Sequence, residues 1–469
     1  MKWWSVVAAA LLALALALVL TTSAQAPQPS ETASPEPWDA SVPTPAALTA
    51  RTPAADPDEV AAVLRGRLSG SDLGSHVLAE VAGLTGDPLV SVGTGSATPA
   101  STAKLLTTAA ALHVYGPEAT FATRVLSPRS GVIVLVGGGD PLLATEPSKP
   151  TGKSQTPVAD LTTLAATTAT ALKAAGVTVV RLAYDDSLFA GPATSPAWPS
   201  TYVPEDVVSP VSALRVDEGL LPGSEGGGRD LTPAVTAARR FAALLESDGI
   251  TVGAKLRHGA GTGDEVARVE SAPLRQIVEH TLQTSDNDAA ETLAHLVGAR
   301  AGDGSFSGGA TATTAALTEL GVPLDGVTLA DGSGLSHDDA LTPAALTSVL
   351  RLATTDPDLQ VLSYGLPVAG FSGSLAARYT DDGSDGGLGV VRAKTGTLTG
   401  VSALAGFVTD ADGTPLVYVV IADEVPVANT LKARQALDDA AAALATCHCS
   451  ATASGDGTAT AQPSATVAP

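Results

Sequence analysis

Apolar residues recur along the chain with two spacings, one typical of helices and one typical of strands. Between residues 55 and 446, apolar side chains three or four positions apart predict helices, whereas short apolar or alternating runs predict strands. A hairpin is predicted over 76–92, around Gly86-Asp87-Pro88. Helices are predicted at 58–68, 101–115, 158–175, 233–245, 273–283, 288–300 and 429–445, and strands at 120–126, 132–136, 177–184, 390–394, 401–409 and 416–422.

The order of these elements predicts the fold class. Helices lie near both ends of the region, and adjacent strands follow one another late in it. We therefore expect an α+β fold, an α/β sandwich in which helices flank an antiparallel sheet. The 469 residues are enough for two or more domains.

Both ends of the chain differ in composition from this region. Lys2, an apolar run from Trp3 to Leu20 and the small residues before Gln25-Ala26 predict an export signal over 1–26. An uncleaved membrane anchor is the alternative, and both place the rest of the chain outside the cytoplasm. A linker is predicted at 27–54 and a disordered tail at 447–469.

Charge and metal-binding residues narrow the possible partners. The formal net charge of -22 argues against nucleic acid, whose backbone needs a basic face. The seven histidines show no metal-ligand spacing. Cys447 and Cys449 flank His448, an incomplete set for zinc, so we expect a pair of tail thiols, free or oxidised. No metal or cofactor is predicted.

Three short motifs carry hydroxyl, amine and amide groups. They occur in the order Ser101-Thr102-Ala103-Lys104, Ser285-Asp286-Asn287 and Lys394-Thr395-Gly396, on a predicted helix, loop and strand. Each motif alone is weak evidence for catalysis, since a serine before a helix usually serves only to cap that helix. The chain has only eight lysines, however, and two of them fall in these motifs.

The first motif has the spacing required for an activated serine. Residues three apart on a helix share a face, so Lys104 can reach the Ser101 hydroxyl and remove its proton. We expect partial burial and Lys394, a second cation, to keep the Lys104 amine neutral. Ser285 is then the candidate that relays a proton to the leaving amine.

The remaining motif residues suit substrate binding. Asn287 offers an amide for a substrate peptide group, and Lys394 offers positive charge for a carboxylate, with the hydroxyls of Thr395 and Thr397 beside it. Gly396 lets a substrate approach the strand closely. The backbone N–H groups of Ser101 and Thr397 are the candidate oxyanion hole.

These motifs are shared by class A β-lactamases and penicillin-binding proteins. Together with several further short segments of sequence, these motifs make the chain resemble the D-alanyl-D-alanine carboxypeptidase/endopeptidase family of penicillin-binding proteins over about 55–440. The further segments are Val136-Gly137-Gly138-Gly139-Asp140-Pro141, Ser212-Ala213-Leu214, Asp331-Gly332-Ser333-Gly334-Leu335-Ser336, Leu341-Thr342-Pro343 and Leu366-Pro367-Val368-Ala369-Gly370.

The resemblance implies a β-lactamase/transpeptidase-like catalytic domain interrupted by an insertion. Ser101 and Ser285 are 184 positions apart, but Ser285 and Lys394 only 109. We therefore expect a catalytic domain at 55–127 and 266–446 and inserted material at 128–265. The implied substrates are D-Ala-D-Ala stem peptides of peptidoglycan, and β-lactams are the implied inhibitors.

Three alternatives stay open from sequence. A β-lactamase would need a fast deacylation base, for which no glutamate is obvious. A catalytically silent cell-wall binding protein would not be expected to keep every motif residue. A general esterase could use the same Ser101–Lys104 pair. Whether carboxypeptidase or endopeptidase cleavage dominates is also open.

Overall fold

The computed structural model describes residues 54–147, 158–221, 228–451 and 465–467. The predicted signal or anchor at 1–26 and all but the last residue of the predicted linker at 27–54 lie outside these ranges. Within them, no helix is both long and apolar enough to cross a membrane.

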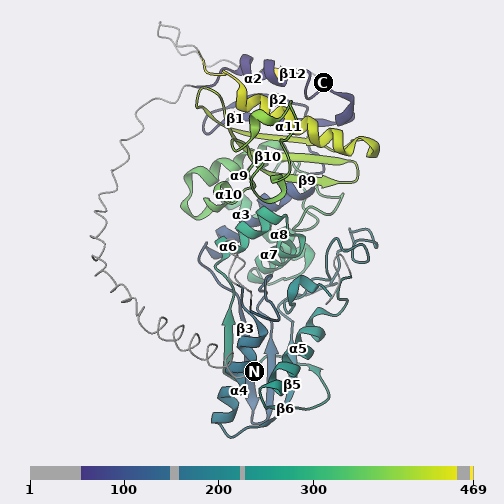
Figure 1. The fold of residues 1–469 in the computed structure, drawn as a ribbon, viewed down its shortest axis with the longest axis vertical. Coiled ribbons are helices and arrows are strands. Elements are labelled where there is room, and N and C mark those ends of the chain that lie inside the picture. The colour runs from purple at the N-terminus through teal and green to yellow at the C-terminus, as the bar shows by residue number, and fades with distance from the viewer. Residues whose placement is uncertain (1–53, 148–157, 222–227, 452–464, 468–469) are drawn as a thin grey trace, which may run out of the picture. The chain divides into compact units, whose positions relative to one another are not determined.

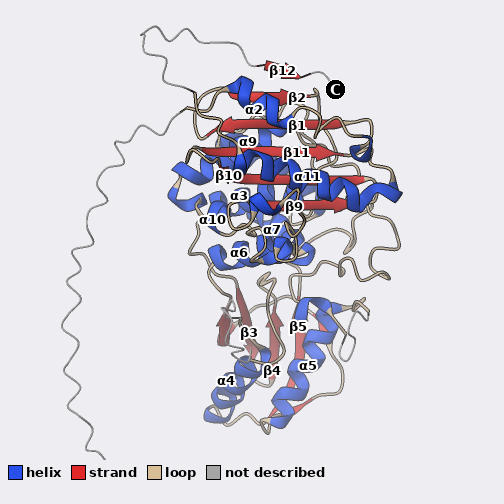
Figure 2. Ribbon diagram, turned by 45° about the horizontal axis from the view of Figure 1, so that its top comes forward, coloured by secondary structure: helices blue, strands red, loops and turns tan. Residues whose placement is uncertain are grey.

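Six strands form the first sheet, in the order β12-β2-β1-β11-β10-β9 (Figures 1 and 2). Neighbouring strands are antiparallel, except that β12 runs parallel to β2. The predicted hairpin corresponds to the first two strands. The strands are β1 (Val77–Gly83), β2 (Pro88–Val92), β9 (Arg392–Leu398), β10 (Val401–Thr409), β11 (Pro415–Ala422) and β12 (Ala465–Val467).

The central strands separate two apolar cores. In β11, Val417 and Val419 belong to one core, whereas Leu416 and Val420 belong to the other. Side chains alternate across a strand, so a strand that is apolar throughout must be covered on both faces. The sheet is therefore the middle of three layers.

The helices divide between these two cores. One core is completed by α2 (Pro57–Leu64) and α11 (Thr430–Thr446). Six helices contribute to the other: α3 (Lys104–Tyr115), α6 (Leu274–Thr284), α7 (Asn287–Arg300), α8 (Phe306–Glu319), α9 (Pro343–Thr355) and α10 (Val361–Tyr364).

A second sheet has its own core, with the strand order β6-β5-β4-β3-β8 and β7 beside β5. Two helices, α4 (Leu161–Ala174) and α5 (Pro233–Ser247), supply apolar residues to that core (Figure 2). The strands are β3 (Ala122–Arg129), β4 (Val132–Val136), β5 (Val179–Asp185), β6 (Thr251–Val252), β7 (Arg257–His258) and β8 (Asp264–Glu270).

The chain passes between the two sheets at two neighbouring points. Phe121 and Ser271 exchange hydrogen bonds: the Ser271 N–H donates to the Phe121 carbonyl at 3.1 Å, and the Phe121 N–H donates to the Ser271 hydroxyl oxygen at 2.9 Å. Phe121 belongs to a core of the first sheet, whereas Val125 belongs to that of the second. We propose that the insertion, expected at 128–265, begins and ends at this crossing.

The folded chain continues beyond Thr446, although a disordered tail was expected from 447. Cys447 and Cys449 form a disulfide, and both are buried. The carbonyl of Cys449 accepts a hydrogen bond from the Asp56 N–H at 2.6 Å, and Ser450 bridges to Ala55. This segment therefore joins the two ends of the folded chain.

A buried ion pair fixes α11 to the loop before β9. The Arg378 guanidinium donates two hydrogen bonds to the Asp438 carboxylate, at 2.9 and 2.6 Å, and both side chains are almost wholly buried. Removing one member of such a pair leaves an uncompensated buried charge.

We expect Arg378→Met to lower the free energy of unfolding by about 3–5 kcal/mol, because Asp438 would lose its partner. Urea titration followed by circular dichroism measures the change. The double variant Arg378→Met/Asp438→Leu should regain much of the loss. An unchanged midpoint in the single variant would contradict this role.

Candidate active site

Ser101 lies in a 3-10 turn that leads directly into α3. Two glycines allow other segments to pack against this turn. A Cβ atom at Gly334 would lie 2.0 Å from the backbone oxygen of Ala100, and one at Gly396 would lie 2.6 Å from that of Pro99. Both distances are too short for any side chain, so the glycines permit the loop and strand to reach Ser101.

The Lys104 amine lies at the centre of the site. Its Nζ is 2.8 Å from the Ser101 Oγ, 2.7 Å from the Asn287 Oδ1 and 2.7 Å from the Ser333 carbonyl oxygen. The side chain has no exposed surface. The Lys104 amine thus reaches Ser101, as its spacing predicted, and it also joins the first motif to the second through Asn287, which the sequence analysis did not predict.

The surroundings of Lys104 favour its neutral form. Burial lowers its pKa to about 8, although the negative charges of Asp331 and Glu291 act in the opposite direction. A neutral amine has two N–H donors and one lone pair. Asn287 Oδ1 and the Ser333 carbonyl can only accept, so they take the two donors and leave the lone pair for the Ser101 hydroxyl.

Burial, rather than the second cation, is the main cause of this lowered pKa. The charge of Lys394, which was expected to help keep Lys104 neutral, is not among the causes of its lowered pKa. Repulsion between the two amines does act at Lys394, whose pKa is held well below its usual value first by burial and then by the charge of Lys104.

The Ser333 carbonyl is held in place by a buried loop, which the sequence analysis noted only as one of the segments that carry the family resemblance. The Glu291 carboxylate accepts hydrogen bonds from the backbone N–H groups of Gly332 and Ser333. Asp331 accepts one from the Trp198 indole at 2.7 Å. Sequence reasoning missed Glu291, although it follows Asn287 by one turn of the same helix.

Ser285 and Lys394 form a second contact. The Lys394 Nζ donates to the Ser285 Oγ at 2.8 Å and to the Thr395 carbonyl at 2.8 Å. Ser285 ends α6 with a left-handed backbone (φ 60°), which turns its hydroxyl toward β9. The second and third motifs are therefore joined as well.

Residues between the first two motifs hold the start of α7. The Asn287 Nδ2 donates to the Val207 carbonyl at 2.9 Å, so both ends of this amide contact protein groups. The next residue, Asp288, is buried and pairs with Arg215 at 2.9 Å and Arg229 at 3.1 Å. These contacts with Val207, Arg215 and Arg229 hold the second motif in place.

The third motif lies on β9, the last strand of its sheet. Arg392 bridges to Val368, but no described strand pairs with the outer edge of 394–398. The Thr395 Oγ1 is 2.8 Å from the Ser374 Oγ, and Thr397 is exposed. Sequence reasoning did not identify Ser374. This open edge lies beside the Ser101 turn.

One group near the second motif contains potential metal ligands. Ligand atoms of Glu218, His280 and Asp286 lie within 4.8 Å of one another. The His280 Nε2 is 3.3 Å from the Asp286 Oδ2. Burial lowers the pKa of His280, but the hydrogen bond and charge of Asp286 outweigh it and raise the pKa overall. The Asp286 carboxylate therefore favours the imidazolium form of His280.

Known proteins resemble this chain over most of its length. It is 35% identical over 362 residues to carboxypeptidase DacB of Mycolicibacterium smegmatis, covering 75% of this chain and 76% of the relative. It is 33% identical over 427 residues to a carboxypeptidase of Mycobacterium tuberculosis, covering 88% and 86%.

A solved structure shows the same fold. Penicillin-binding protein 4 of Haemophilus influenzae matches with a TM-score of 0.66 and 21% identity, over 81% of this chain and 97% of that chain. This likeness confirms the predicted α+β fold of the penicillin-binding type. Residues 60–224 and 228–444 match the D-Ala-D-Ala carboxypeptidase 3 (S13) family. With this match and the two relatives, the resemblance stated from sequence is confirmed: the chain belongs to that family.

Proposed function

We propose that this chain performs the serine-type D-Ala-D-Ala carboxypeptidase reaction of its family through an acyl-enzyme on Ser101. The carrying observation is the 2.8 Å contact between the Lys104 Nζ and the Ser101 Oγ, in a site where the other partners of the amine are acceptors. A base must be neutral to accept a proton, and burial favours that state.

The first step transfers the peptide to the enzyme. The Ser101 proton moves to the Lys104 Nζ while the Oγ attacks the carbonyl carbon of the penultimate D-alanine. The backbone N–H groups of Ser101 and Thr397 are the proposed donors to the oxyanion. The C–N bond then breaks, and the Ser285 hydroxyl passes a proton to the departing amine, taking another from Lys394, which lies 2.8 Å away.

The second step returns the enzyme to its starting state. Water adds to the ester carbon as its proton passes through the Ser285 hydroxyl to Lys394. The C–O bond to Ser101 then breaks, and the Ser101 oxygen takes its proton back from Lys104. The released acid is the shortened stem peptide. A cross-link that ends in a D-alanyl bond offers the same carbonyl, which supports endopeptidase cleavage as a second outcome of this chemistry.

The terminal carboxylate of the substrate is assigned to the third motif. We propose that it lies against Lys394, with the hydroxyls of Thr395 and Thr397 as further donors. Burial and the Lys104 charge disfavour the ammonium form of Lys394. A bound carboxylate would restore that form, because an opposite charge favours protonation. Gly396 completes the proposed binding site along the open strand. Asn287 was expected to bind a substrate peptide group, but its amide already contacts Lys104 and Val207, so we propose that it positions Lys104 instead.

β-Lactams are proposed as inhibitors that acylate Ser101, since they present a strained amide in place of the D-alanyl bond. We also propose that the enzyme works outside the cytoplasm, where peptidoglycan is found. The export signal or anchor at 1–26 supports this location, as does the Cys447–Cys449 disulfide.

Replacing the nucleophile tests the acyl-enzyme directly. We expect Ser101→Ala to abolish labelling by a fluorescent penicillin and to lower D-Ala release by about a thousandfold or more, because no hydroxyl remains to attack. Mass spectrometry locates the modified residue. Ser130→Ala, at an exposed serine of the insertion, is the matched control and should label normally. Equal labelling of both variants would refute the proposal.

The lifetime of the adduct separates the remaining alternatives. A penicillin-binding carboxypeptidase should keep the penicilloyl group for many turnovers of peptide, whereas a β-lactamase should release it quickly. Turnover of a D-Ala-D-Ala peptide but not of its L-Ala-L-Ala counterpart excludes both a silent binding protein and a general esterase.

The pKa of Lys104 predicts how activity depends on pH. The neutral amine is the competent form, so acylation should rise about tenfold per pH unit below about 8 and level off above it. The measurement is kcat/KM between about pH 6 and 10. An uncharged ester substrate avoids any contribution from carboxylate binding. A flat profile across this range would remove Lys104 as the base.

Neutralising the third motif should affect substrates selectively. Lys394→Met keeps the unbranched shape and most of the length of the side chain but removes its charge, so we expect kcat/KM for a peptide with a free carboxylate to fall by about a hundredfold. The C-terminally amidated peptide should lose much less. Lys173→Met, at an exposed lysine of α4, is the control. Equal losses for both peptides would show that Lys394 does not recognise the carboxylate.

A further inference from the structure

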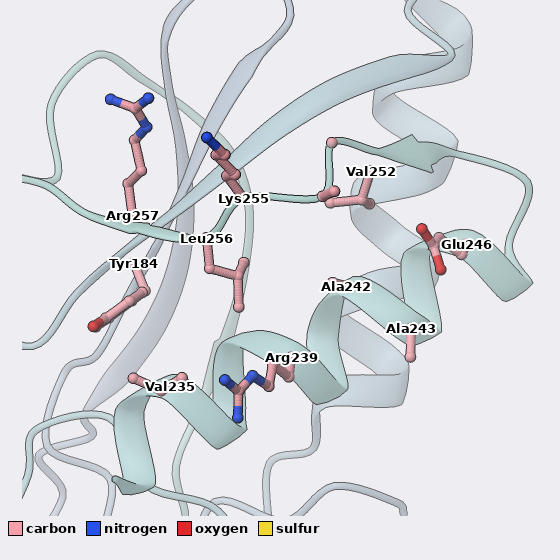
Figure 3. A pocket seen from close by; sticks show the side chains of 12 residues that line it. Tyr184, Val235, Arg239, Ala242, Ala243, Glu246, Val252, Lys255, Leu256 and Arg257 are labelled. Carbon is pink, nitrogen blue, oxygen red and sulfur yellow. The ribbon is translucent and has the colours of Figure 1, made fainter.

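Two hollows lie along one edge of the second sheet, and no residue that lines them belongs to the three catalytic motifs. The larger, about 700 Å³, lies between α5 and residues 252–257. Figure 3 shows it from close by. The smaller, about 410 Å³, is lined by residues of β4 and β5 and by the same segment. The two hollows therefore adjoin each other along residues 253–257.

The smaller hollow concentrates positive charge in an acidic protein. Arg129, Arg181, Lys255 and Arg257 line it together with only apolar residues and glycine, and no carboxylate is among them. All four side chains belong to exposed residues, and none forms an ion pair with any residue that the structure describes. The whole chain has a formal net charge of -22, so this grouping is not a consequence of composition.

The local backbone explains why the cations gather there. Arg257 pairs with Ala183 across β7 and β5, and Arg181 pairs with Val132 across β5 and β4. In Figure 3 the Leu256 side chain extends toward α5, whereas Lys255 and Arg257 extend away from it. This alternation buries the leucine and presents both cations to solvent.

The larger hollow extends the positive surface past this segment. Arg239 on α5 lines it, together with Tyr184, Lys255 and Arg257, and Glu246 is its one carboxylate. Arg239 likewise has no ion-pair partner among the described residues. The two hollows thus form one surface, the cationic edge, made of Arg129, Arg181, Arg239, Lys255 and Arg257.

We propose that the cationic edge binds a linear polyanion that carries repeated phosphodiester groups. Exposed unpaired cations in a concave surface favour a ligand with several charges, and their extent along both hollows favours a chain over a single ion. Guanidinium groups match the oxygen pairs of phosphate, and tetrahedral phosphate offers oxygens to more than one such group. Carboxylates elsewhere on the protein do not cancel the positive potential of the cationic edge, because salt screens interactions between exposed charges more than about 8 Å apart at physiological ionic strength.

Binding at the cationic edge would keep the enzyme in the cell wall, because a bound wall polymer would hold it near peptidoglycan without occupying the catalytic site. This inference does not rest on the proposed roles of Ser101 or Lys394. Its failure would leave D-alanine release and penicillin labelling unchanged, so the two proposals are tested separately.

The probe is inorganic polyphosphate, titrated into the whole chain by calorimetry at about 50 and 200 mM salt, a range over which such binding weakens steeply. We expect binding that falls with salt, and a loss of at least about tenfold in affinity for Arg181→Gln/Lys255→Gln/Arg257→Gln. The control is Arg65→Gln/Arg67→Gln/Lys173→Gln, which makes the same change in net charge at exposed residues outside both hollows. Both triple variants should hydrolyse a small D-Ala-D-Ala peptide normally.

Three results would overturn the proposal. The first is no binding of polyphosphate at the lower salt. The second is an equal loss of affinity in the control variant, which would indicate a general charge effect. The third is equal affinity for poly-L-glutamate of similar charge, which would show that the surface recognises carboxylates as well as phosphates.

Discussion

The site depends on keeping one lysine amine out of water. Lys104 has no exposed surface, and burial is the main reason that its pKa falls to about 8. Burying an amine is costly unless its hydrogen bonds are satisfied, and here three oxygens lie within 2.8 Å of the nitrogen. Packing and hydrogen bonding therefore leave this amine partly neutral near physiological pH, as its proposed role as a base requires.

Holding those three oxygens in place requires parts of the chain that are distant in sequence. Glu291 fixes the loop that carries the Ser333 carbonyl, and Asp331 ties this loop to Trp198 of the insertion. The Asp288 pair with Arg215 anchors α7, which carries Asn287. Partly satisfied buried polar networks are destabilising, so these contacts act as a unit. Trp198 and Arg215, which lie in the proposed insertion, thus help to support the proposed catalytic residues.

Sequence alone predicted the motif residues and most elements because their signals are local. The Ser101–Lys104 spacing is a property of one helical turn, and the late strands β10 and β11 are mostly apolar. It did not predict α8, whose first residues include two glycines, or α9, although Thr342 and Pro343 are a standard helix start. The contributions of Ser333, Ser374 and Glu291 could not be predicted, because they depend on contacts between segments that are far apart in the chain. The cationic edge could not be predicted either, because the net charge of the sequence does not show which charged residues lie together in the fold.

The open side of β9 has a consequence for selectivity. A peptide that joins a sheet at its edge is gripped mainly by its own amide groups, which are the same for every amino acid. Such a grip distinguishes poorly between side chains but responds strongly to chain direction and to the handedness of each α-carbon, because both set where the amides point. An enzyme built this way is suited to ligands whose stereochemistry, rather than side-chain identity, sets them apart from ordinary proteins.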